Sequence, residues 1–247
     1  MRFSTSNWHN RYQQQASWTR EMRAHLISGI DHTNFKKVLE IGCGTGAVLQ
    51  DFSNLGFQQL FGLDCDFQAL TFARSHIEGC RFLSGSAYHI PFTNGSFDIT
   101  YCHYLLLWLE KPLSALLEMA RVTKPGGYVF AFAEPDYTGR IVYPPELQKF
   151  AELQSKSLQQ QGAELSIGRR LNSLFIDTGL MDIRTGIIGA EGKYESQSSS
   201  SEYLMMMNDL CKINPTFNDN QLKLLMRRKD LINFVPTFFA CGRVKVD

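Results

Sequence analysis

The sequence lacks the long apolar runs of a membrane protein. No stretch approaches the roughly 18 consecutive apolar residues that are needed to span a bilayer. Residues 1–18 are polar and aromatic and contain no apolar segment of the kind found in signal peptides. We therefore expect no membrane span and a cytoplasmic location.

Paired cysteines and an excess of charge of either sign are also missing. The six cysteines are widely spaced and none forms a C-x-x-C pair, which argues against a zinc site or a dithiol redox motif. The formal net charge is +1, from 25 basic and 24 acidic residues, so electrostatics give no reason to expect a nucleic acid as partner. We expect reduced thiols, no metal site and no nucleic-acid partner.

Short apolar segments alternate with segments of helical periodicity over the first half of the chain. With 247 residues, the protein can form one domain with a substantial core. The expected strands are residues 38–41, 59–64, 80–84, 97–102 and 128–133, and the expected helices are residues 47–55, 67–76 and 113–122. This alternation indicates a parallel sheet that is covered by helices on both faces.

Other elements are expected on both sides of this alternation. Residues 7–30 have the apolar spacing of one helix. Helices are also expected at residues 146–161 and 169–178, with a strand at residues 181–188. The segment from residue 234 to 246 predicts a last strand, or two strands separated at Pro236.

The strongest local signal is a glycine-rich loop after the first strand. Residues 38–47 read VLEIGCGTGA and place three glycines between a buried strand and a helix. Glycines permit a tight turn and let a ligand approach the backbone closely. Their spacing fits a loose dinucleotide-binding fingerprint. However, Glu40 is a poor neighbour for a pyrophosphate and suits a cationic ligand such as S-adenosylmethionine.

An acidic residue also ends the second strand. Asp64 lies 18 positions after Gly46 and can accept hydrogen bonds from both hydroxyls of an adenosyl ribose. NAD and S-adenosylmethionine both contain this ribose, so Asp64 does not discriminate between them. We expect the neighbouring Asp66 to cap the next helix.

Three further segments match one family pattern in order and spacing. Residues 85–92 (GSAYHIPF) and 96–98 (SFD) match the segments around the fourth strand, and residues 121–127 (RVTKPGG) match the turn before the fifth. Together with E-x-G-x-G-x-G at residues 40–46, they resemble the class I S-adenosylmethionine-dependent methyltransferases over residues 36–133. The chain is similar to the small-molecule branch, which includes ubiquinone and menaquinone C-methyltransferases.

The resemblance implies a fold and a division of the chain. The implied α/β fold is a doubly wound, Rossmann-like, mostly parallel sheet of seven strands, with an antiparallel last strand and helical cap insertions. The single domain over residues 1–247 would comprise a helical lid (1–35), a cofactor-binding core (36–134), two caps (135–165 and 191–232) and the last strand (233–247).

The resemblance also implies which residues bind the methionine part of the cofactor. Gly42, Cys43 and Gly44 would line the methionine part, and Glu40 would hold its amino group. Arg11 and Tyr12 of the leading helix are candidates for binding the carboxylate, although their helix also fits one with solvated arginines.

The adenosine part is expected to contact a second group of residues. Asp64 would bind the ribose, with Cys65 beside the adenine and Ser86 and Ala87 at its edge. The family usually has an aspartate in place of Ser86. A serine hydroxyl can accept the same hydrogen bond without charge, so we expect weaker adenine recognition.

Residues after strands four and five are candidates for the acceptor side. Cys102 and His103 would lie near the transferable methyl group. We consider His103 as a general base, or as a residue that only lines the pocket. Substrate contacts are expected from Tyr104, Asp136 and Tyr137, although Asp136 is equally consistent with capping its loop.

The predicted function is therefore methyl transfer from S-adenosylmethionine, giving S-adenosylhomocysteine, to a small and partly hydrophobic acceptor. The hydrophobic acceptor is suggested by apolar and aromatic cap residues and by the cluster at Met205, Met206 and Met207. Two alternatives remain: an NAD-linked oxidoreductase on a related fold, and a non-catalytic cofactor-binding protein. The sequence does not identify the acceptor.

Overall fold

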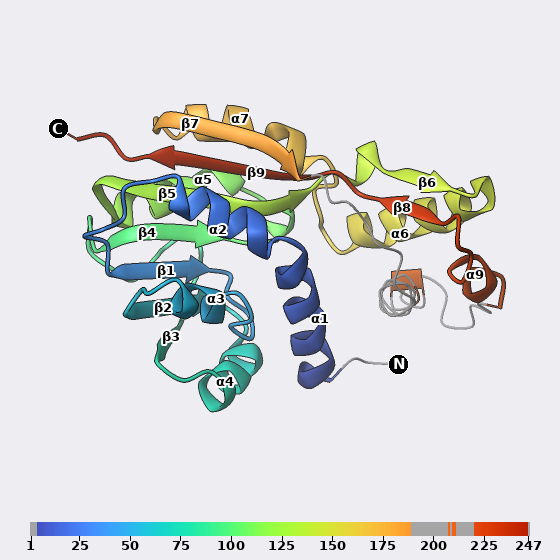
Figure 1. The fold of residues 1–247 in the computed structure, drawn as a ribbon, viewed down its shortest axis with the longest axis horizontal. Helices are drawn as coiled ribbons and strands as arrows, with labels where there is room; N and C mark the ends of the chain where they lie inside the picture. Colours follow the sequence, from blue (N-terminus) through green and yellow to red (C-terminus); the bar gives the residue numbers. More distant parts are fainter. Residues whose placement is uncertain (1–3, 189–206, 208, 211–219, 247) are drawn as a thin grey trace.

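The centre of the protein is a seven-stranded sheet. The computed structural model describes residues 4–188, 207, 209–210 and 220–246. The strand order is β3-β2-β1-β4-β5-β9-β7 (Figure 1). These strands are β3 (Cys80–Ser84), β2 (Gln59–Asp64), β1 (Lys37–Ile41), β4 (Phe97–Cys102), β5 (Thr123–Pro135), β9 (Thr237–Arg243) and β7 (Met181–Ile188). The pairs on the β3-to-β5 side are parallel, and β9 is antiparallel to both neighbours. The predicted fold class is confirmed.

The helices cover both faces of the sheet. The N-terminal pair is α1 (Thr5–Trp18) and α2 (Arg20–Ser28), and α3 (Leu49–Asn54) and α4 (Phe67–His76) follow β1 and β2. The other helices of the described residues are α5 (Pro112–Val122), α6 (Gln148–Gln160), α7 (Ile167–Asp177) and α9 (Asn220–Leu225). Three short 3-10 helices are η1 (Leu106–Trp108), η2 (Tyr137–Gly139) and η3 (Pro145–Leu147).

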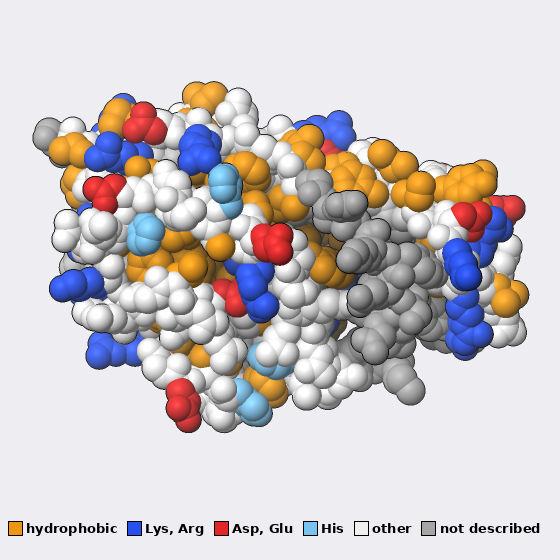
Figure 2. Space-filling view, viewed as in Figure 1, with side chains coloured by type: hydrophobic (Ala, Val, Ile, Leu, Met, Phe, Trp, Pro, Cys, Tyr) orange, Lys and Arg blue, Asp and Glu red, His pale blue; other side chains and the backbone are white. Residues whose placement is uncertain are grey.

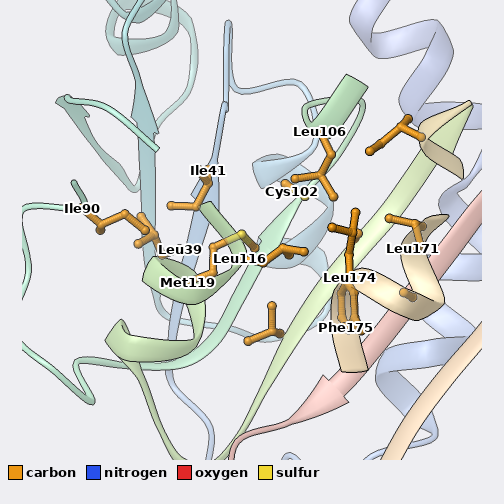
Figure 3. Packing of buried hydrophobic residues seen from close by; sticks show 14 of the residues in the cluster. Leu39, Ile41, Ile90, Cys102, Leu106, Leu116, Met119, Leu171, Leu174 and Phe175 are labelled. Atoms are coloured by element: carbon orange, nitrogen blue, oxygen red, sulfur yellow. The ribbon is translucent and has the colours of Figure 1, made fainter. Parts of the chain in front are cut away.

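Alternating side chains of the central strands divide the core into two layers. Leu39 and Ile41 of β1 belong to the layer that α5 and α7 cover (Figure 3), and Val38 belongs to the layer under the first four helices. Tyr101 and Cys102 of β4 separate in the same way. Because successive side chains of a strand point to opposite faces, Glu40 lies on the Val38 side.

The N-terminal segment differs from the expected single helix. Thr19 has φ −113° and ψ 5° and ends α1, and α2 begins at the next residue. Threonine is a weak helix former whose hydroxyl competes for hydrogen bonds. Here that hydroxyl contacts Arg23 and His103, so long-range contacts fix the break.

A second, two-stranded sheet was not expected. β6 (Ile141–Tyr143) pairs antiparallel with β8 (Ile232–Phe234), and β8 and β9 flank Pro236, as in the second alternative for the last strand. Apolar side chains on this ribbon are exposed, and hydrophobic side chains gather over it in Figure 2. Met205 and Met206 of the methionine cluster lie outside the described residues, whereas Met207 packs on a small core beside α6 and α9.

Candidate functional site

A cavity of about 470 Å³ lies at the carboxyl ends of β1, β2 and β4. In open parallel sheets, ligands bind at this edge. Thirteen of the fifteen predicted site residues line the cavity: Arg11, Tyr12, Glu40, Gly42, Cys43, Gly44, Asp64, Cys65, Ser86, Ala87, His103, Tyr104 and Tyr137. Cys102 and Asp136 are not among the residues that line it.

The glycine loop forms one wall and leaves its backbone accessible. Gly42 and Gly44 have φ values of +70° and +50°, a region that other residues rarely adopt. A Cβ on Gly42 would lie 2.6 Å from a methyl carbon of Leu105. The loop is tied to β2 because the Gly42 and Cys43 amides both donate to the Leu63 carbonyl, at 2.8 and 3.1 Å. The positive φ values of Gly42 and Gly44 and the close approach of Leu105 favour glycine at these two positions.

Glu40 is a buried carboxylate at the end of β1. It is 2% exposed, and its Oε2 accepts a hydrogen bond of 3.0 Å from the Tyr101 hydroxyl. Burial raises the pKa of Glu40 to about 8, and the Tyr101 bond and the charge of Arg23 oppose this rise. Glu40 has one hydrogen bond to the described residues, and it lines the cavity. In its charged form it can therefore bind a ligand cation.

Asp64 joins the end of β2 to the glycine loop. Its Oδ2 accepts from the Gly44 amide at 2.6 Å and its Oδ1 from the Asp66 amide at 2.8 Å. These bonds orient the carboxylate and still leave lone pairs for ribose hydroxyls. Asp66 accepts from the amides of Gln68 and Ala69 and caps α4, which confirms the role expected for it.

Helix α1 lies over the loop. The Tyr12 ring lies 3.5 Å from the position of a Cβ on Gly44, and its pKa is raised by burial and by the nearby Asp64 and Asp66. Arg11 is 9% exposed, and its guanidinium stacks 4.8 Å from the Trp18 ring centroid. Figure 1 shows α1 beside this edge of the sheet. The helix therefore brings a cation and an aromatic hydroxyl to the cavity.

His103 follows β4 and is held from the side of α2. Its Nε2 lies 2.9 Å from the Thr19 hydroxyl and 3.5 Å from Arg23 Nη1. Arg23 is 1% exposed, forms an ion pair with Asp51 and donates to the Thr19 hydroxyl. Burial, together with the charge of Arg23, keeps the pKa of His103 well below its ordinary value. A histidine in this setting is neutral and a weak base.

The part of the cavity where the sequence predicts substrate contacts is built on the residues after β4. Tyr104 has φ +53°, an uncommon conformation for a residue with a side chain, and its amide donates to the Ala133 carbonyl at 2.9 Å. Burial is the main cause that raises the pKa of Tyr104, to about 12, and that of Tyr137, so both phenols are protonated at neutral pH.

Glu134 fixes the loop that lines this end. Its carboxylate is fully buried and accepts from the amides of Leu105, Leu106 and Leu107, at 3.0, 3.0 and 3.2 Å. These are the orphan donors at the start of η1. Burial raises the pKa of Glu134 to about 7, although the three amides favour its charged form. Glu134 acts on the shape of the cavity and does not line it.

The two predicted residues that do not line the cavity have structural contacts. Cys102 is fully buried in the α5 and α7 layer, with its sulfur 3.9 Å from Glu134. Asp136 is 1% exposed, pairs with Arg169 and accepts from the amides of Thr138 and Gly139, both at 3.1 Å. This is the loop-capping role that the sequence left open for Asp136.

Several residues that line the cavity were not predicted. Trp8 and Gln15 come from α1, and Leu158, Gln161 and Asp209 come from the cap region. The remaining ones lie close to predicted residues: Ala47, Val48, Leu63, Gly85, Tyr88, Leu105, Leu107, Trp108 and Leu109. The apolar run Leu105–Leu109 is visible in the sequence. Which of its side chains face the cavity depends on the loop conformation, which the hydrogen bonds to Glu134 fix.

The described residues also bear on metal, disulfide and membrane sites. No group of three or more His, Cys, Asp or Glu side chains in the described part of the chain is arranged to hold a metal ion. All five cysteines that the structure describes have free thiols, and Cys211 lies outside these residues. Within the described ranges, no helix is both long and apolar enough to cross a membrane.

Part of the chain is similar to known methyltransferases. Residues 39–131 match the family described as "Methyltransferase domain". An uncharacterized methyltransferase of Schizosaccharomyces pombe is 33% identical over 154 residues, which cover 57% of this chain and 55% of that protein. A demethylmenaquinone methyltransferase of Renibacterium salmoninarum is 30% identical over 134 residues, or 53% of this chain and 56% of that protein. The chain thus spans about half the length of these curated relatives.

The fold comparison agrees with the strand order. A solved S-adenosylmethionine-dependent methyltransferase from Thermotoga maritima superposes with a TM-score of 0.57 over 97% of this chain and 96% of that chain. The sequence identity is 16%, so this likeness concerns the fold alone.

Proposed function

We propose that this chain transfers a methyl group from S-adenosylmethionine to a small organic acceptor, since residues 39–131 match a methyltransferase domain and the sheet has the strand order of that fold. The observation that carries the proposal is the pair of carboxylates at the edge of the sheet. Glu40 and Asp64 end neighbouring strands and both line the cavity beside the open backbone of the glycine loop.

The residues of the cavity fit this cofactor. Glu40 is a buried carboxylate and would hold the ammonium of the methionine part. The absence of a Cβ on Gly42 lets Leu105 pack closely against the loop, while the backbone of Gly42, Cys43 and Gly44 still lines the cavity and is available to a ligand. Asp64 would accept from the ribose hydroxyls, with Cys65, Ser86 and Ala87 beside the adenine. Arg11 and Tyr12 would bind the methionine carboxylate under α1.

The fit is poorer for a dinucleotide. A pyrophosphate at the glycine loop would lie close to Glu40, and burial of two like charges without a partner is costly. With its pKa raised to about 8, Glu40 would stay protonated beside a pyrophosphate and gain no charged partner, whereas an ammonium would stabilise its charged form. The non-catalytic alternative is opposed by the further space on the acceptor side, which Tyr104, Tyr137 and Leu158 line.

The acceptor side favours a small, partly apolar molecule. The residues Leu105, Leu107 and Leu109 supply an apolar wall, and two protonated phenols supply hydrogen bonds. The relative named for demethylmenaquinone supports an acceptor of this general kind. The expected cytoplasmic location remains a prediction.

The protein's part in the reaction is binding, alignment and exclusion of water. The sulfonium of the bound cofactor supplies an already activated methyl group. Glu40 and Asp64 would fix the two ends of the cofactor, and α1 would cover it, so that the acceptor atom meets the methyl group in line. The backbone of Tyr104 has a positive φ and is hydrogen-bonded to β5. It would thereby fix the position of the residues that contact the acceptor.

Calorimetric titration with S-adenosylmethionine and S-adenosylhomocysteine tests the proposal, with NAD as the control ligand. We expect both sulfur ligands to bind and NAD to give no heat. A screen of small quinols, phenols and carboxylic acids as acceptors would then follow methyl transfer by mass. Binding of NAD alone would overturn the proposal and favour the oxidoreductase.

A further inference from the structure

The hydrogen bonds around His103 define which of its ring nitrogens carries the proton. Arg23 is always a donor, and its Nη1 lies 3.5 Å from His103 Nε2. A hydrogen on Nε2 would therefore point at another N–H group. The Thr19 hydroxyl oxygen already accepts from Arg23, so its own hydrogen is available for the 2.9 Å contact with Nε2.

The competing arrangement places its donors less favourably. If Nε2 carried the hydrogen, the Thr19 hydroxyl would have to donate to the Ala16 carbonyl at 3.3 Å. That carbonyl already accepts from Arg23 Nη2 at 2.9 Å. The Thr19 oxygen would then accept from Nε2–H at 2.9 Å as well as from Arg23, but its own hydrogen would move to the longer contact with a carbonyl that is already in use. In addition, Nε2–H and the Nη1–H of Arg23 would be two donors whose nitrogens lie 3.5 Å apart.

From these contacts we infer that Thr19 and Arg23 hold His103 as the neutral Nδ1–H tautomer, which presents a hydrogen-bond donor to the cavity. His103 lines the cavity, and its Nδ1 has no hydrogen bond to any residue that the structure describes. Thr19 and Arg23 are positioning residues that act through His103. Nδ1–H would donate a hydrogen bond to an oxygen of the acceptor molecule: a carbonyl, carboxylate or enolate oxygen.

This arrangement gives His103 a different role from the general base expected from the sequence. The lone pair of Nε2 is used by Thr19, and a second proton would place a cation beside Arg23. Two acidic groups adjoin this network: Asp51, which forms an ion pair with Arg23, and Glu40, on which Arg23 acts electrostatically. A donor to oxygen favours acceptors whose negative charge sits on, or is delocalised to, that oxygen.

Nitrogen-15 NMR of the histidine rings in the ligand-free protein tests the tautomer directly. We expect His103 to carry its proton on Nδ1 and to remain neutral at about pH 6.5, where a free histidine is half protonated. A dominant Nε2–H form, or titration of His103 near its ordinary value, would overturn the inference. The experiment needs neither cofactor nor acceptor, so its outcome is independent of the proposed function on which the acceptor chemistry rests.

Matched variants test the positioning residues. Thr19→Val removes the hydroxyl and should give a mixture of tautomers, whereas Thr19→Ser keeps the hydroxyl and should retain Nδ1–H. Arg23→Gln should raise the pKa of His103, and if that variant does not fold, the Thr19 pair alone decides. An unchanged tautomer in Thr19→Val would refute the role of Thr19.

An activity measurement separates a donor from a base. With an acceptor from the screen described above, His103→Asn keeps an N–H near the position of Nδ1 and should lose less than about tenfold in kcat/KM. Loss of a general base costs about 10²- to 10⁴-fold. A loss in that range, together with loss of the acidic limb of the pH profile, would restore the general base and reject the donor.

Discussion

Glu40 and Tyr101 are register partners on adjacent strands β1 and β4, and the phenol donates a 3.0 Å hydrogen bond to the buried carboxylate. The bond satisfies part of the carboxylate and leaves the rest of it for the cavity. A buried carboxylate with incomplete hydrogen bonding lowers the stability of the fold. A ligand cation would supply the missing partner.

The first prediction concerns Glu40→Gln, which keeps the shape and removes the charge. We expect the affinity for S-adenosylhomocysteine to fall at least about tenfold, since a hydrogen bond to a charged group contributes about 1.5–3 kcal/mol. The variant should also unfold at a higher temperature than the wild type near pH 8, because the charged form of Glu40 is disfavoured by burial. Calorimetric titration and thermal unfolding measure the two effects. Equal affinity in the two proteins would remove Glu40 from the site.

The second prediction is the pH dependence of cofactor binding. The pKa of Glu40 is raised to about 8 in the free protein, so a bound ammonium should favour its charged form and release a proton. Affinity should therefore rise as the pH increases from about 6 to 8, and the heat of binding should depend on the ionisation enthalpy of the buffer. Glu40→Gln should show neither effect, and buffer-independent heats in the wild type would contradict the linkage.

The raised pKa values of buried carboxyl groups also determine how stability changes with pH. For Glu40 and Glu134, the folded pKa values of about 8 and about 7 exceed the ordinary value of 4.5. Their contribution to stability is therefore present below pH 4.5 and lost as the pH rises through these folded values. Asp98 and Asp136 have lowered pKa values and act in the opposite direction at low pH.

The third prediction compares two neighbouring aspartates. Asp64→Ala should weaken S-adenosylhomocysteine binding by about 10- to 100-fold, because it removes the expected ribose acceptor and the bond to the Gly44 amide. Asp66→Ala should cost about 1 kcal/mol of stability through loss of the helix cap, with little effect on binding. Titration and denaturant unfolding of both variants separate the roles. An equal loss of binding in both variants would mean that a change in the loop structure, rather than loss of the Asp64 carboxylate, weakens binding.

The local parts of the site could be predicted from the sequence because they depend on neighbouring residues. The strand before the glycines, the positive-φ glycines and the helix cap at Asp66 are all encoded within a few positions. Strand alternation also placed Tyr101 and Cys102 on opposite faces. These features follow from backbone geometry alone.

The remaining parts depend on contacts between distant segments. His103 meets Thr19 across 84 positions, and β6 pairs with β8 across the whole cap region. The periodicity of apolar residues in the sequence gives no information about contacts between such distant segments. The same reason explains Asp136, whose sequence position suits a rim residue but whose carboxylate is taken by Arg169.

The fourth prediction concerns Glu134, which joins β5 to the loop at Leu105–Leu107. Glu134→Gln replaces one acceptor oxygen by an NH₂ group that faces backbone amides, so we expect a loss of about 1–3 kcal/mol in unfolding free energy. Urea denaturation measures this loss. Glu118→Gln is a matched control, since that carboxylate is partly exposed and should cost less. Equal losses would show that the Glu134 bonds contribute no more than a surface contact.

The last prediction concerns Ser86, at a position where the class I methyltransferases that this chain resembles usually have aspartate. Its hydroxyl accepts from the Tyr88 amide at 3.2 Å and the residue is exposed at the rim of the cavity, so a longer side chain can be accommodated. Ser86→Asp should therefore tighten S-adenosylhomocysteine binding by about threefold to tenfold, because a carboxylate accepts more strongly than a hydroxyl from the adenine amino group. Ser86→Asn provides an uncharged side chain of similar shape and should give a smaller gain. Weaker binding in Ser86→Asp than in Ser86→Asn would mean that the adenine does not lie at this edge, and the adenosine end of the proposed site would then have to be placed elsewhere along β2 and β3.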